Sequence, residues 1–211
     1  MKEKEIQDEL SSIRSLMERS SKFISLSGLS GILAGVYALI GAAIAYSMLY
    51  NGSARAPFHE HHGIIDDILM DVFVLKLFAV ALLVLIASVM TGIILSINKA
   101  KRKGQQVWGA TSRALLFNMA VPLVSGGLLI FILLARGHFG VIAPASLIFY
   151  GLALVAASNF TFKDVRYLGI FEIILGLGAG CLPGYGLWFW AAGFGLLHIV
   201  YGSIMYLKYD R

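Results

Sequence analysis

The sequence predicts an all-α polytopic membrane protein: a six-transmembrane-helix bundle with both termini in the cytoplasm, preceded by an N-terminal cytosolic amphipathic helix. Hydrophobic residues make up 58% of the 211 positions and charged residues only 14%, with a mean hydropathy of +0.80. A soluble domain of this length carries roughly 25% charged residues. The apolar runs reach the 20 or so residues that cross a bilayer core as a helix, and the alternating pattern of a membrane barrel is absent.

Residues 1–22 are predicted to form a cytosolic amphipathic arm. Ile6, Leu10, Ile13 and Met17 recur at helical spacing and fall on one face, opposite a charged face. Two interpretations stay open. The arm lies on the lipid surface, or it docks a cytosolic protein partner.

The first predicted span is 23–50. Ser27, Gly31 and Gly35 follow one another at four-residue steps along it. Small residues in such a ladder let helix backbones approach closely, which favours tight packing inside one bundle over a homo-oligomer interface.

A polar loop, Asn51–Asp71, follows outside the membrane. It contains His59, His61, His62 and Asp66, which are ligand types suited to zinc or another divalent metal. The alternative is a solvated histidine-rich loop, because the HExxH spacing is missing. Apart from this metal, no cofactor is expected.

The rest of the chain alternates spans with short connectors. A polybasic connector with Lys99, Lys101, Arg102 and Lys103 is predicted to contact anionic headgroups of membrane lipids on the cytoplasmic side. A hairpin around Arg136-Gly137-His138 and another around Pro183-Gly184 join the last four spans. The predicted spans after the first are 72–97, 114–135, 139–157, 165–182 and 185–207, followed by a cytosolic tail, 208–211.

The distribution of cations predicts the orientation. With the N-terminus inside, 14 of the 17 lysines and arginines lie in cytoplasmic segments, and Arg55, Lys76 and Arg136 lie on the other side. Cytoplasmic loops carry this excess of positive charge. This excess of cations on one side therefore predicts six spans with both termini in the cytoplasm.

A layer of polar residues is predicted in the cytoplasmic half of the bundle. It consists of Glu172, His198, Asn118, Thr91 and Ser88, which come to similar depths when counted at 1.5 Å per residue from the basic ends. If the last hairpin turns at Pro183-Gly184, Glu172 lies opposite Gly195, and His198 lies one turn further in. Both ionisable residues share faces with glycines, so both are expected to point into the bundle rather than toward lipid.

An acid and an imidazole placed together in a membrane can exchange a proton, and intramembrane ionisable groups are functional hypotheses. The structural alternative is a polar contact that fixes helix register. The sequence alone leaves both open.

Two stretches carry a resemblance. They are the segment LMERSS (Leu16–Ser21) with SGLSGILAGVYALIGA (Ser27–Ala42), and GFGLLHIVYGSIMYLKYD (Gly193–Asp210). Both resemble a group of small multi-pass bacterial inner-membrane proteins that have no assigned activity. The resemblance implies a bacterial cytoplasmic membrane and six spans, and it implies no catalytic residue.

Three classes of function are weighed. No nucleophile elbow, P-loop, dinucleotide fingerprint or HExxH motif is present, so an enzyme is not expected. The basic residues flank apolar runs, so no nucleic-acid partner is expected. A scaffold or regulatory interaction protein asks least of the sequence and ranks first. A small proton-linked transporter or channel built on Glu172 and His198 ranks second, and a metal-binding membrane protein third.

Overall fold

The computed structural model describes residues 27–50, 64–102 and 107–210, together with Gln7 and Gly104, and for residues 64–71 it describes the backbone alone. Helices dominate these ranges, and no strand occurs within them. The helices are α2 (Gly28–Tyr50), α3 (Ile64–Arg102), α4 (Ala110–Ala135), the 3-10 turn η1 (Phe139–Val141), α5 (Ile142–Ala157), α6 (Asp164–Cys181), α7 (Gly186–Trp190), the π-helix η2 (Ala191–Leu197), α8 (His198–Met205) and the π-helix η3 (Tyr206–Asp210).

Five of these helical segments are long and apolar enough to cross a membrane. They are α2, α3 from Val72, α4, η1 with α5, and the continuous segment from α7 to η3, which we call the terminal helix. The remaining long helix, α6, has 18 residues, and Asp164, Arg166 and Glu172 all lie in it. These charges separate α6 from the others by composition, although its length is sufficient.

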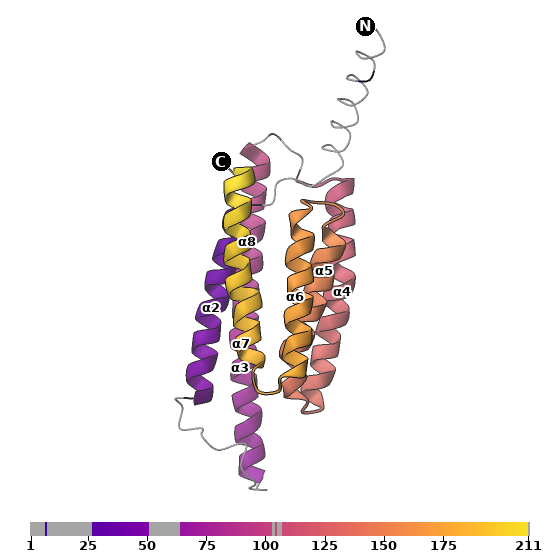
Figure 1. Ribbon diagram of the computed structural model, residues 1–211. Coiled ribbons are helices and arrows are strands. Elements are labelled where there is room, and N and C mark those ends of the chain that lie inside the picture. Colours follow the sequence, from indigo (N-terminus) through magenta and orange to yellow (C-terminus); the bar gives the residue numbers. More distant parts are fainter. Residues whose placement is uncertain (1–6, 8–26, 51–63, 103, 105–106, 211) are drawn as a thin grey trace.

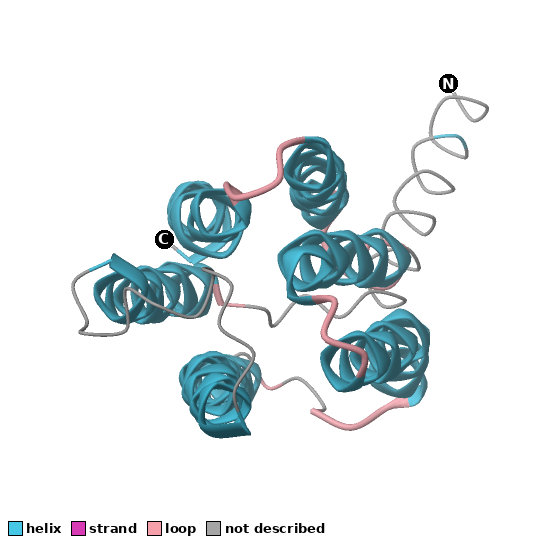
Figure 2. Cartoon of the chain, turned by 90° about the horizontal axis from the view of Figure 1, so that it is seen from below, coloured by secondary structure: helices cyan, strands magenta, loops and turns pink. Residues whose placement is uncertain are grey.

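The helices stand side by side with their axes roughly parallel (Figures 1 and 2). The terminal helix packs against α2 on one side and against the α5–α6 pair on the other, while α3 packs on α2 and α4 packs on α5. Phe78 of α3 and Phe131 of α4 contact each other, with ring centroids 5.7 Å apart. The terminal helix therefore connects the pair α2 and α3 with the group α4, α5 and α6.

Glycines set the closest of these contacts. A Cβ placed on Gly35 of α2 would lie 2.6 Å from the carbonyl oxygen of Gly195, and one placed on Gly151 of α5 would lie 2.5 Å from that of Gly169 on α6. Gly31 likewise faces Gly202 of the terminal helix. The prediction that the α2 ladder packs inside the bundle is thus confirmed, because Gly31 and Gly35 approach a helix of the same chain.

The α3 helix is longer at both ends than predicted. It begins at Ile64, so 64–71 is helix rather than loop, and it continues through Lys99, Lys101 and Arg102, which were assigned to a connector. Ile64, Ile65, Ile68 and Leu69 recur at helical spacing. That periodicity extends the helix past the first charged residues. In the same way, α4 begins at Ala110 instead of 114.

The last predicted span, 185–207, is a helix of mixed type. It changes from α to π at Ala191, returns to α at His198 and ends in a second π-helix. A π-helix has i→i+5 hydrogen bonds and occurs mostly as short insertions, frequently at functional sites. The first π-helix ends immediately before His198.

Candidate functional site

Glu172 and His198 meet inside the bundle. Glu172, the ninth residue of α6, has no exposed surface, and His198 is 6% exposed. Oε1 of Glu172 lies 3.4 Å from Nδ1 of His198. Neither carboxyl oxygen has a hydrogen-bond partner within the described part of the chain. An isolated buried carboxylate is costly, so the neighbouring imidazole is the group that can compensate its charge.

The two ring nitrogens of His198 have different partners. Nδ1 is 3.0 Å from the carbonyl oxygen of Gly193, and Nε2 is 2.8 Å from the hydroxyl of Tyr150 on α5. A carbonyl oxygen can only accept, so Nδ1 carries a proton in this contact. Nε2 of the neutral ring then accepts from the Tyr150 hydroxyl. When the ring is protonated, Nε2 donates to the same oxygen instead.

The π-helix gives Glu172 its space. A Cβ on Gly193 would overlap Oε2 of Glu172 and would lie 2.6 Å from Cδ2 of Leu147, which is also fully buried. The Gly193 carbonyl oxygen also contacts Nδ1 of His198, so this glycine borders both members of the pair. The expected position of Glu172 opposite Gly195 is therefore wrong, because that count assumed equal numbers of residues on the two sides of the Pro183-Gly184 turn, whereas Gly193 is the residue that meets the carboxyl group. Gly195 packs against Leu39 of α2.

Aromatic rings cover the imidazole. Phe194 stacks on His198 with centroids 6.0 Å apart, and Tyr150 contacts both rings at 5.0 and 5.4 Å. Trp190 extends the group from the other side of Phe194. These rings limit the access of water to the His198 side chain and hold its orientation.

The other members of the predicted polar layer do not join this pair. The Asn118 amide donates to the carbonyl of Ala114 in its own helix, and the Thr91 hydroxyl lies 3.5 Å from the Tyr37 hydroxyl of α2. Ser88 is half-buried on α3. The site thus consists of Glu172, His198 and Tyr150, with Gly193 as the residue that admits the carboxyl group.

Sequence reasoning missed Tyr150 and Gly193. Tyr150 is a tyrosine inside an apolar span, and a buried phenol usually finds a hydrogen-bond partner, which was the available signal. Gly193 could not be distinguished from the many other glycines of the chain, because its role depends on the π-helical turn.

The predicted metal and headgroup residues lie partly outside the described part of the chain. His59, His61 and His62 lie outside the described residues, as does Lys103, and only the backbone is described for Asp66. Within the described residues no group of three metal-ligating side chains occurs. Lys101 and Arg102 are exposed at the end of α3, whereas the Lys99 side chain is only 12% exposed and pairs with Asp210.

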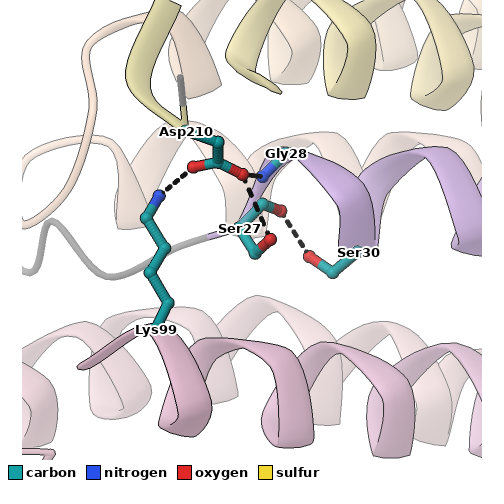
Figure 3. A network of polar contacts seen from close by, with 5 residues as sticks. All are labelled: Ser27, Gly28, Ser30, Lys99 and Asp210. Atoms are coloured by element: carbon teal, nitrogen blue, oxygen red, sulfur yellow. Dashed lines mark hydrogen bonds and ion pairs between the residues drawn. The ribbon is translucent and has the colours of Figure 1, made fainter. Parts of the chain in front are cut away.

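Asp210 ties three helices together at one end of the bundle (Figure 3). Its Oδ1 pairs with the Lys99 ammonium of α3. Its Oδ2 accepts hydrogen bonds from the Gly28 backbone N–H at 2.8 Å and the Ser27 hydroxyl at 3.2 Å. A carboxylate at a helix N-terminus accepts a hydrogen bond from an otherwise unpaired N–H and interacts favourably with the positive end of the helix dipole. The end of the terminal helix therefore caps α2.

A second carboxylate fixes the same end against α6. Oδ2 of Asp164 accepts from the Lys208 ammonium at 2.9 Å and from the Tyr209 hydroxyl at 2.8 Å. Burial raises the pKa of Asp164, but the hydrogen bonds from Lys208 and Tyr209 oppose that effect and hold the pKa below its ordinary value. Asp164 is therefore a carboxylate at neutral pH.

The chain was compared with known proteins in three ways. No protein-family model matches it, and no curated protein or solved structure does so either. The site must be interpreted from its own geometry.

Proposed function

We propose that the protein is a small proton-linked transporter or channel in which Glu172, His198 and Tyr150 form the proton-binding site. The supporting observation is the fully buried carboxyl group of Glu172, which has no hydrogen-bond partner within the described part of the chain and lies 3.4 Å from the His198 imidazole. A contact that only fixed helix register would satisfy these oxygens, since buried polar groups are normally hydrogen-bonded.

Proton binding follows from the contacts of the pair. An ionised carboxylate beside a neutral imidazole leaves an uncompensated buried charge, which one proton bound by the pair would remove. That proton resides on the carboxyl group or completes the imidazolium, whose Nδ1 faces the carboxylate. Tyr150 adapts to either form, because its hydroxyl both donates and accepts. The pair can thus hold the proton on either member while staying neutral overall. Because Nδ1 already carries a proton, the imidazolium has its added proton on Nε2, at the Tyr150 hydroxyl.

The proposal includes the membrane topology expected from the sequence. In it, α6 is the fifth of six spans and the terminal helix is the sixth. The buried Glu172 of α6 faces the bundle, and Asp164 and Arg166 lie in its first turn. Both termini are cytoplasmic, which puts the polybasic end of α3 on the cytoplasmic side of a bacterial inner membrane. The resemblance described above supports the same membrane.

The test uses the proton itself as the probe. The purified protein is reconstituted into liposomes that contain a pH-sensitive dye, and a potassium diffusion potential drives protons inward. We expect an acidification rate above that of protein-free liposomes, which the isosteric variant Glu172→Gln lowers to the protein-free level. The folding of this variant is checked by its melting temperature and by its elution from a size-exclusion column.

Two results would overturn this function. One is a wild-type rate equal to that of protein-free liposomes under both directions of the potential. The other is an unchanged rate in the folded Glu172→Gln variant.

The scaffold role and the metal-binding role stay predictions. Residues 1–22, expected to contact a cytosolic partner, lie outside the described residues except for Gln7, and so does the histidine segment 59–62.

A further inference from the structure

The Tyr201 hydroxyl is a second buried polar group without a hydrogen-bond partner among the described residues. Tyr201 follows His198 by three residues on α8, so both lie on one helix face. A buried hydroxyl without a partner is unusual in a folded protein and requires an explanation. The Glu172 site does not use this group.

Tyr201 lies between the buried site and one end of the bundle. It packs, as Tyr150 does, against the core formed by Leu154, Val165 and Leu168. This shared cluster brings Tyr201 near Tyr150 and near the start of α6, because Val165 directly follows Asp164 in the chain.

The end of this series reaches the surface. The Asp164 side chain is 27% exposed, and its partner Lys208 is 52% exposed. Asp164 precedes Glu172 by eight residues on α6, about 12 Å along the helix axis. The titratable groups thus form a series from the exposed end to the buried carboxyl: Asp164 with Tyr209, then Tyr201, then Tyr150 with His198, then Glu172.

We propose that Tyr201 relays protons between Asp164 at the end of the bundle and the Glu172–His198 pair. This inference rests on the proposed function and assigns the side from which protons enter. Asp164, a carboxylate at neutral pH, first takes a proton from the water outside. The Tyr201 hydroxyl then accepts that proton as it gives its own to its inner neighbour, so one O–H bond forms as another breaks. Rotation of the hydroxyl then restores the starting state. Where two successive groups of the relay lie farther apart than a hydrogen bond, a bridging water molecule would carry the proton between them.

The entry side is the end at which Asp164, Lys208 and Asp210 lie. In the predicted topology this end faces the cytoplasm. The opposite end of the terminal helix, near Gly186, has the aromatic residues Trp188 and Trp190 instead.

The test measures proton exchange at His198 directly, without requiring transport. Nitrogen-15-labelled histidine reports the exchange rate of the imidazole N–H with water, and a His198→Gln variant identifies the signal. We expect Tyr201→Phe to slow this exchange about tenfold, which corresponds to about 1.4 kcal/mol of activation free energy. Tyr206→Phe, which removes an exposed hydroxyl from the same helix, is the matched control and should exchange at the wild-type rate.

Folding is not expected to obscure the result. Because the Tyr201 hydroxyl has no hydrogen-bond partner within the described residues, its removal should leave the melting temperature unchanged or slightly raised. Asp164→Asn tests the entry point separately and should also slow exchange at His198.

The outcomes separate this inference from the proposed function. Exchange at the wild-type rate in Tyr201→Phe overturns the relay, and so does equal slowing in Tyr206→Phe. If the liposome flux depends on Glu172 but not on Tyr201, transport stands and the relay falls. If exchange depends on Tyr201 while the liposomes show no flux, the relay stands and transport falls.

Discussion

Replacing Gly193 with alanine tests the geometry of the site most directly. The added methyl group would overlap Oε2 of Glu172 and lie 2.6 Å from Leu147, and both of these side chains are fully buried. Neither has solvent into which to move. Overpacking of this kind costs about 1–3 kcal/mol. The melting temperature should therefore fall by several degrees, since about 2–4 °C corresponds to each kcal/mol in a chain of this size.

The matched control is Gly127→Ala in α4, where a Cβ would meet no atom within 4 Å. Both variants replace a helical glycine, so the difference between their melting temperatures isolates the clash. The second readout is the imidazole signal of His198, which should shift in Gly193→Ala because the carboxyl group is pushed away from Nδ1. Equal melting temperatures for the two variants, with an unshifted His198 signal, would refute the interpretation of Gly193 as the residue that admits Glu172.

Three further predictions concern the packing and the end of the bundle. Asp210→Asn removes the ion pair and weakens the cap of α2, and we expect a loss of about 1–2 kcal/mol in a chemical or thermal unfolding assay, with no loss if the cap is unimportant. The pKa of Asp164 is lower in the folded state, so its stabilising contribution is complete above the unfolded value of about 4 and is lost as the pH falls through the lower folded value. The melting temperature should fall over that acidic range, and Asp164→Asn should flatten the slope; an unchanged slope would contradict the ion-pair assignment. Gly151→Leu should disrupt the close approach to the Gly169 backbone and prevent isolation of a folded protein, whereas Gly92→Leu on α3, where a Cβ would meet no atom within 4 Å, should be tolerated.

Hydropathy was a sufficient basis for the helical segments, because long apolar runs have few alternatives in lipid. The predicted boundaries agree closely for 139–157 and for α6. They fail at Ile64, where a charged stretch retains helical periodicity and continues α3 into the predicted loop. Composition decides which segments are apolar, but periodicity decides where a helix ends.

The meeting of Glu172 and His198 was also predictable, since adjacent helices joined by a short turn pack together and glycines mark the packed faces. The register was not. The change from α to π turns at Ala191 rotates the following residues about the helix axis, and no local sequence pattern predicts that change. Tyr150 and Asp210 were missed for a related reason, because each acts on a helix distant in the sequence.

The position of Glu172 on α6 has a consequence for biosynthesis. In the proposed six-span topology, α6 enters the bilayer before the imidazole that faces its carboxyl group has been made, because the segment with His198 follows α6 in the chain. A helix with three ionisable side chains inserts poorly alone, but its glycine contact with α5 would allow the two helices to enter as a closely packed hairpin. Under that topology, the hairpin of α5 and α6 keeps Glu172 away from lipid until the terminal helix is made.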